Sequence, residues 1–153
     1  MAWTTAGELM TSTKMNTIFP AGASDFQTWS PSYANLTVGN GTVVARYTII
    51  GDLVVARWVF TLGSTSSIGT APTVSLPVTA QSANALAGHS ARYTDTGTAN
   101  YPGIVGQPST TTAGLLVANV GSTYPTQANV TATVPFTWTT GDVARLWMIY
   151  EQA

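Results

Sequence analysis

The fold of this chain is decided by one stretch, Thr42-Val-Val-Ala-Arg-Tyr-Thr-Ile-Ile-Gly51-Asp52-Leu-Val-Val-Ala-Arg-Trp-Val-Phe-Thr-Leu62. Two runs rich in β-branched and aromatic residues flank Gly51-Asp52, a glycine-first pair that is typical of a two-residue type II′ turn. The turn predicts an antiparallel hairpin and fixes its register, which places Arg46 opposite Arg57.

Alternation along this hairpin divides its side chains between two faces. One face is predicted to be the core face, and it carries Val43, Ala45, Tyr47, Ile49, Val54, Ala56, Trp58 and Phe60. The other face carries Val44, Thr48, Ile50, Leu53, Val55 and Val59 around the two opposed arginines. A solvated face would be more polar, and directly opposed like charges are unfavourable. We therefore expect the second face to be half buried against another surface.

Strand and turn signals continue along the chain at intervals of about 8 to 12 residues, which favours a β-sandwich or a barrel. The predicted strands cover residues 33–38, 42–50, 53–62, 72–78, 85–93, 103–107, 113–119, 128–138 and 142–150. These segments are not copies of one another, which disfavours a propeller or a β-solenoid. The fold class is therefore predicted to be all-β.

The last predicted hairpin runs from Val134 through the turn at residues 139–142 into residues 143–150, and its final strand is apolar on both faces. Such a strand belongs in the middle of a structure, and its second face is expected to meet a neighbouring subunit. Together the two hairpins supply the predicted subunit interface, formed by Arg46, Val55, Arg57, Val59, Arg145 and Trp147.

Residues 1–28 differ from the rest of the chain and are predicted to form an N-terminal arm, with residues 29–153 forming the β-domain. Thr5 and Glu8 have the spacing of a capping box, so a short helix is plausible over residues 6–19. The arm either packs on its own domain or docks on another protein. Its docking residues would be the apolar ones, namely Trp3, Leu9, Met10, Met15, Ile18 and Phe19.

Composition excludes several classes of protein. The chain has 153 residues, a formal net charge of −1 and only 7% charged residues, which excludes a basic nucleic-acid surface. The absence of cysteine excludes disulfides, thiolate zinc sites and cysteine nucleophiles. No apolar run approaches the roughly 20 residues of a membrane-spanning helix, so no membrane insertion is expected. The N-terminus lacks the features of a secretory signal, which favours synthesis in a cytoplasm.

Candidate catalytic and metal-binding residues are sparse. His89, Ser90 and Asp95 contain the residue types of a hydrolase triad, but neighbouring residues of a strand point to opposite faces. The segment from Asp95 to Asn100 has several oxygen-bearing side chains around a glycine, which suits either a calcium site or an ordinary polar turn. We favour the ordinary turn. We expect neither catalysis nor a cofactor.

Four aromatic residues, Trp29, Tyr33, Tyr101 and Tyr124, stand in loop-like positions. They could stack on sugar rings of a host surface glycan, or they could serve as packing anchors, and the sequence leaves both roles open.

Five segments of the chain resemble small virion proteins of tailed bacteriophages, namely head decoration, head fibre and minor tail proteins. These segments are the opening Thr5-Ala-Gly-Glu-Leu-Met-Thr-Ser-Thr-Lys-Met-Asn16, the stretches Tyr33 to Val54, Phe60 to Gly69 and Val74 to Val78, and the ending from Thr140 to Tyr150. The resemblance implies an antiparallel jelly-roll sandwich of the tumour-necrosis-factor type, assembled as a homotrimer and attached to capsid or tail proteins on the virion surface. It implies a non-enzymatic structural role in decorating the capsid. The alternative is a receptor-binding module at the tail tip or fibre.

Overall fold

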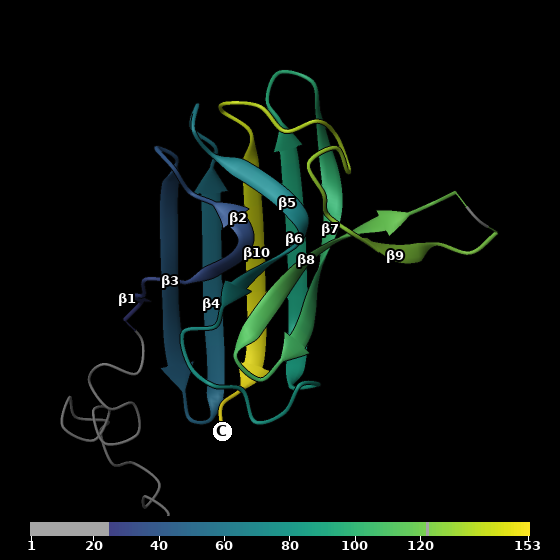
Figure 1. The fold of residues 1–153 in the computed structure, drawn as a ribbon. Helices are drawn as coiled ribbons and strands as arrows, with labels where there is room; N and C mark the ends of the chain where they lie inside the picture. The colour runs from purple at the N-terminus through teal and green to yellow at the C-terminus, as the bar shows by residue number, and fades with distance from the viewer. Residues whose placement is uncertain (1–24, 122) are drawn as a thin grey trace, which may run out of the picture.

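A computed structural model describes residues 25–121 and 123–153 of the chain, and the helix expected over residues 6–19 lies outside this part. All regular structure in the described residues is β-structure (Figure 1). The strands are β1 (Gln27–Thr28), β2 (Tyr33–Thr37), β3 (Thr42–Ile50), β4 (Leu53–Thr61), β5 (Ser67–Ser75), β6 (Leu86–Asp95), β7 (Ala99–Ser109), β8 (Thr112–Asn119), β9 (Thr126–Asn129) and β10 (Val143–Glu151).

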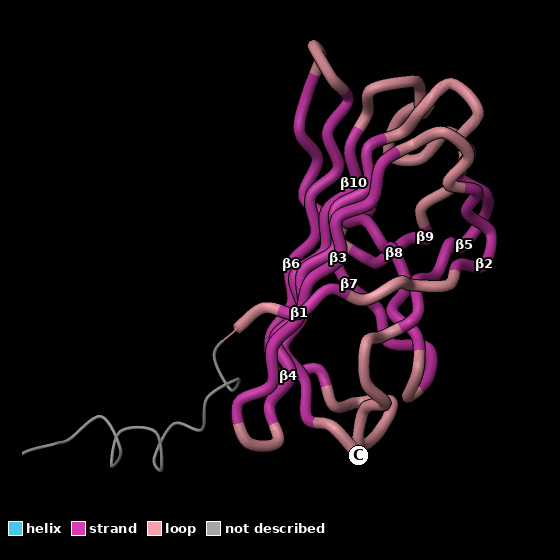
Figure 2. The backbone as a smooth tube through the Cα atoms, turned by 90° about the vertical axis from the view of Figure 1, so that its left-hand side faces the viewer, coloured by secondary structure: helices cyan, strands magenta, loops and turns pink. Residues whose placement is uncertain are grey.

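The strands form one antiparallel sheet in the order β1-β3-β4-β10-β6-β7-β8-β5-β2, with β9 paired to β8 off this path. The sheet curls at β6 and β7, so that β2, β5 and β8 lie across β3, β4 and β10 (Figure 1). The view turned by 90° separates these two groups into two layers (Figure 2). The all-β, antiparallel, jelly-roll-like sandwich expected from the sequence is therefore confirmed.

The β3–β4 hairpin has the predicted register, with Arg46 opposite Arg57 and Ile50 opposite Leu53. Gly51 adopts a φ of 61°, as the first position of a type II′ turn requires. The predicted core face of this hairpin packs against the opposite layer, and Trp58 and Phe60 are fully buried. The local sequence therefore encodes this hairpin correctly.

The predicted pairing of the last hairpin is wrong. β10 lies between β4 and β6 over almost its whole length, so it takes no partner from the segment that precedes it. β9 ends at Asn129, and the following segment, residues 130–142, is a loop in which the Trp138 Nε1–H donates to the Thr131 carbonyl oxygen over 3.0 Å. Pro135 lacks a backbone N–H and cannot donate a ladder hydrogen bond, which disfavours this segment as a strand. The expected central position of β10 is correct.

The core lies between the two layers, and the inward side chains of β4 and β10 form its centre. On β10, Leu146 and Tyr150 are fully buried, and on the opposite layer Val74 and Leu115 are fully buried as well. A large buried core of this kind makes the hydrophobic effect the main source of stability. It also fixes the position of β3, β4, β10 and β6, whose outward side chains face away from the opposite layer.

Candidate functional site

The candidate site is the outer face, which we define as the surface of β3, β4, β10 and β6 that points away from the core. All four arginines of the chain lie on it: Arg46 on β3, Arg57 on β4, Arg145 on β10 and Arg92 on β6. Strand pairing places Arg46 directly opposite Arg57, and Arg145 directly opposite Arg92. The chain has five Lys and Arg residues in total, so this face holds most of its positive charge.

A repeated tripeptide builds both arginine pairs. In each of the four strands, the arginine follows a buried alanine and precedes a large side chain, as in Ala45-Arg46-Tyr47 and Ala56-Arg57-Trp58. In the antiparallel pairing each alanine faces the large residue of its partner, so Ala45 lies opposite Trp58 and Ala56 lies opposite Tyr47. The small and large side chains complement each other in the core, and the arginines are left facing each other outside.

The same arrangement recurs on β10 and β6. Ala144 lies opposite Tyr93, Leu146 lies opposite Ala91, and the two arginines between them pair on the outer face. Arg92 is not among the interface residues predicted from the sequence. The four Ala-Arg dipeptides are the signal that could have found it.

Local contacts hold some of these guanidinium groups in place. The Arg46 Nη2–H donates to the Phe26 carbonyl oxygen over 2.7 Å, and the Arg145 Nη1–H donates to Thr94 Oγ1 over 2.8 Å. Burial and the neighbouring Arg92 guanidinium both lower the pKa of Arg145. The guanidinium groups of Arg57 and Arg92 have no hydrogen bond or ion pair with any residue of the described part of the chain. The two like-charge pairs therefore lack a neutralising carboxylate among these residues.

Apolar side chains surround the arginines on the outer face. Trp147 lies between Arg57 and Ser90 in the strand register and keeps 39% of its surface exposed. A groove of about 300 Å³ opens beside it. The side chains that line this groove include Phe26, Arg46, Val55, Arg57, Trp147 and Ile149. All six residues of the predicted subunit interface lie on the outer face, so the structure brings them together.

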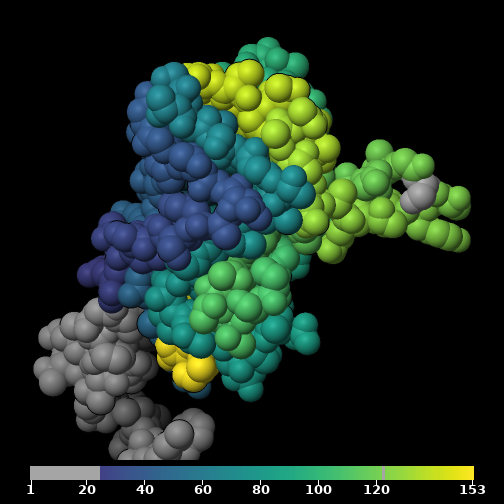
Figure 3. Space-filling view, in the orientation of Figure 1, coloured from purple at the N-terminus to yellow at the C-terminus, as the bar shows by residue number. Residues whose placement is uncertain are grey.

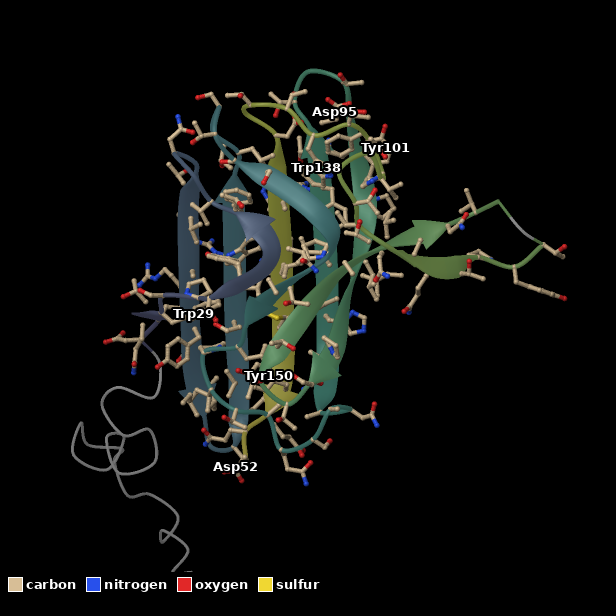
Figure 4. All side chains as sticks on the ribbon, in the orientation of Figure 1. Trp29, Asp52, Asp95, Tyr101, Trp138 and Tyr150 are labelled. Carbon is tan, nitrogen blue, oxygen red and sulfur yellow. The ribbon has the colours of Figure 1, made fainter. Side chains whose placement is uncertain are left out.

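Of the five described side-chain carboxylates, Asp25 directly precedes Phe26, whose carbonyl oxygen accepts from Arg46, and the other four lie at strand ends, in turns or in the interior. Asp52 occupies the β3–β4 turn and Asp95 ends β6, at opposite ends of the sandwich (Figure 4). Asp142 is buried, and its carboxylate accepts backbone hydrogen bonds from Thr139 and Thr96. Glu151 is on the outer face but at the last position of β10. In the second of the two Gly-Asp turns of the sequence, the aspartate side chain therefore links two turns by hydrogen bonds.

The residues considered for catalysis do not form a triad. His89 pairs with core-facing Met148, whereas Ser90 pairs with Trp147 on the outer face, so the two side chains leave opposite faces of β6. Asp95 is at the far end of the same strand. No group of three or more His, Cys, Asp or Glu side chains that could hold a metal ion occurs among residues 25–121 and 123–153. In the segment from Asp95 to Asn100, the Asp95 carbonyl oxygen accepts a turn hydrogen bond from the Thr98 N–H.

The four aromatic residues considered for glycan stacking are not on one platform. Trp29 packs edge-on against Tyr47, and Tyr33 lies against Trp58; both line a second groove of about 460 Å³. The other two lie elsewhere. Tyr101 stacks on Phe136 with ring centroids 5.1 Å apart, and Tyr124 lies in the loop between β8 and β9, with 79% of its surface exposed.

The β8–β9 hairpin projects from the body of the sandwich (Figure 3). Its loop carries the two most exposed large apolar side chains of the described residues, Val120 and Tyr124. The arm residues expected to dock on another protein, Trp3, Leu9, Met10, Met15, Ile18 and Phe19, lie outside the described residues.

Fold and site together define a jelly-roll-like β-sandwich with an arginine-paired, partly apolar outer face. Comparison of the chain with protein-family models, curated proteins and solved structures finds no match. Within the described residues, no helix has the length and apolar character that crossing a membrane requires.

Proposed function

We propose that this protein is a non-enzymatic structural subunit of a tailed-bacteriophage particle, assembled as a homotrimer that decorates the capsid surface. One observation carries the proposal. The outer face exposes an aromatic groove and two arginine pairs that no carboxylate of the described residues neutralises, which is typical of a surface that another protein covers.

The chemistry of the outer face supports a protein interface over a solvated surface. Protein interfaces are enriched in Trp and Arg and depleted in Lys and Glu, and their strongest contacts come from such anchors. Trp147 and Arg57, adjacent in the strand register, provide this combination. Segments within residues 5–16, 33–78 and 140–150 resemble phage virion proteins. This resemblance supports a phage particle as the place where the protein acts.

A receptor-binding role at the tail tip or fibre is the second candidate, and the projecting β8–β9 hairpin favours it. A two-stranded ribbon is marginal in water on its own, and within residues 25–121 and 123–153 no strand pairs with the other edge of β9. An apolar loop such as the one holding Tyr124 suits contact with a host surface protein or glycan.

Two measurements test the proposal. Sedimentation velocity of the purified chain at micromolar concentration should give the mass of a trimer, and a stable monomer would overturn the homotrimer. Particles from cells that produce the protein naturally should then be labelled with a specific antibody and viewed by electron microscopy, with pre-immune antibody as the control. Label over the head supports decoration, label at the tail tip supports the receptor-binding role, and unlabelled particles overturn both.

A further inference from the structure

The two arginine pairs form a compact cationic patch. β3, β4, β10 and β6 are consecutive in the sheet, so three strand spacings of about 4.8 Å each separate the outermost arginines laterally. Along the strands, Arg145 is opposite Val59, two residues beyond Arg57, which offsets the two pairs by about 7 Å. Four guanidinium groups therefore occupy an area that one partner surface can cover.

The core holds this patch together. Each arginine sits beside a buried alanine that packs against a large side chain of the neighbouring strand, as Ala91 does opposite Leu146. A change of register would move those alanines out of the core and the arginines into it. The like charges thus cannot separate by strand slippage, and because no carboxylate of the described residues bonds to them, a bound anionic group would relieve their repulsion.

We propose that the outer face binds a carboxylate-bearing surface of a protein other than a second copy of this chain, with each arginine pair receiving carboxylates. The inference rests on the proposed function in one respect, namely that the partner belongs to the particle. Guanidinium groups bind carboxylates through two parallel hydrogen bonds, and Arg is favoured where this planar recognition is needed. None of the four strands that carry the arginines contains a lysine.

The apolar part of the face selects a protein as the partner. Val44, Val55, Trp147 and Ile149 lie among the arginines, and at least a third of the surface of Val44, Trp147 and Ile149 is exposed. A partner that covers them must bring apolar side chains between its carboxylates, which an acidic protein surface does and a simple polyanion does not.

A second copy of the chain does not supply the required charge. Two-fold stacking of one outer face on another would bring four arginines against four arginines, and in a homotrimer each outer face would meet a different surface of the neighbouring copy. The described carboxylates that are not buried lie at three separate places: Asp25 before β1, Asp95 at the end of β6, and Asp52 with Glu151 at the opposite end of the sandwich (Figure 4). Complementarity to the arginine pairs therefore favours a different, acidic partner.

The test is a fluorescence-anisotropy titration of the full chain at low salt. The probe is a short fluorescein-labelled peptide of alternating glutamate and leucine, and the control peptide has glutamine in place of glutamate. We expect binding of the glutamate peptide only, weakened by added salt. Arg57→Gln and Arg92→Gln should each weaken it by about threefold or more, and the double variant by about tenfold.

Asn84→Asp is the matched control, because it changes the net charge by the same amount in an exposed loop outside the outer face. It should leave binding unchanged. Arg57→Gln should keep its melting temperature, because it removes a like-charge opposition; this separates lost binding from lost folding. Equal weakening by Asn84→Asp and Arg57→Gln would overturn the inference, since net charge alone would then explain the binding.

Two other outcomes would also overturn the inference. Tighter binding of a uronic-acid oligosaccharide than of the glutamate peptide would make an acidic glycan the ligand. A change in oligomeric state with Arg57→Gln would make a second copy the occupant. Labelled particles without peptide binding would reject this inference and leave the proposed function standing. Peptide binding with unlabelled particles would reject the proposed function and leave the acidic-surface binding standing.

Discussion

Replacing Asp142 with alanine would remove the hydrogen bonds that link two turns at one end of the sandwich. The side chain is 1% exposed. Its Oδ2 accepts hydrogen bonds from the Thr139 N–H over 2.6 Å and from Thr139 Oγ1 over 3.2 Å, and its Oδ1 accepts one from the Thr96 N–H over 2.9 Å. The carboxylate thus joins the turn before β10 to the turn between β6 and β7.

The expected loss of stability follows from these contacts. Hydrogen bonds to a charged group contribute about 1.5 to 3 kcal/mol each, and a donor left unsatisfied adds a desolvation penalty. With two backbone donors orphaned, Asp142→Ala should lower the free energy of unfolding by about 3 to 5 kcal/mol. For a chain of this size, that loss lowers the melting temperature on the order of 10 °C.

Asp52→Ala is the matched control, because Asp52 also follows a glycine in a turn but is exposed, and its carboxylate bonds to none of the described residues. Its effect should stay within about 0.5 kcal/mol. Calorimetry and urea titration of both variants measure the difference. Equal melting temperatures for Asp142→Ala and Asp52→Ala would refute the claim that the Asp142 hydrogen bonds stabilise the fold.

Two further predictions concern the core. The Tyr150 hydroxyl donates to the Val78 carbonyl oxygen over 2.9 Å, and burial raises the pKa of Tyr150 from 10.0 to about 12. The unfolded chain loses this proton near pH 10 and the folded chain near pH 12, so its stabilising contribution is complete below pH 10 and is lost as the pH rises to 12. Urea titrations across this range should show that loss, and Tyr150→Phe should make it shallower; an unchanged slope would contradict the assignment. The Cβ added by Gly103→Ala would lie 2.5 Å from the Tyr93 ring, so we expect the free energy of unfolding to fall by about 1 to 3 kcal/mol. The control is Gly114→Ala, whose added Cβ would lie 3.7 Å from its nearest neighbour and should be tolerated. Equal melting temperatures of the two variants would contradict this packing.

The sequence by itself determined the elements that depend on near neighbours. Turn chemistry at Gly51-Asp52 set the register of β3 and β4, and period-two alternation separated Trp58 in the core from Arg57 outside. These features involve residues close in the chain, so turn geometry and side-chain alternation are sufficient to predict them.

Only the tertiary structure decided which strands flank β10. The turn ending at Asp142 looks like a hairpin connection, yet its aspartate turns inward to hold the backbone of Thr96, and β10 pairs with two strands from earlier in the chain. The same pairing brings Arg145 opposite Arg92 and so completes the outer face. Strand order depends on burying apolar faces between segments far apart in sequence, and no local pattern records which of several compatible strands becomes the neighbour.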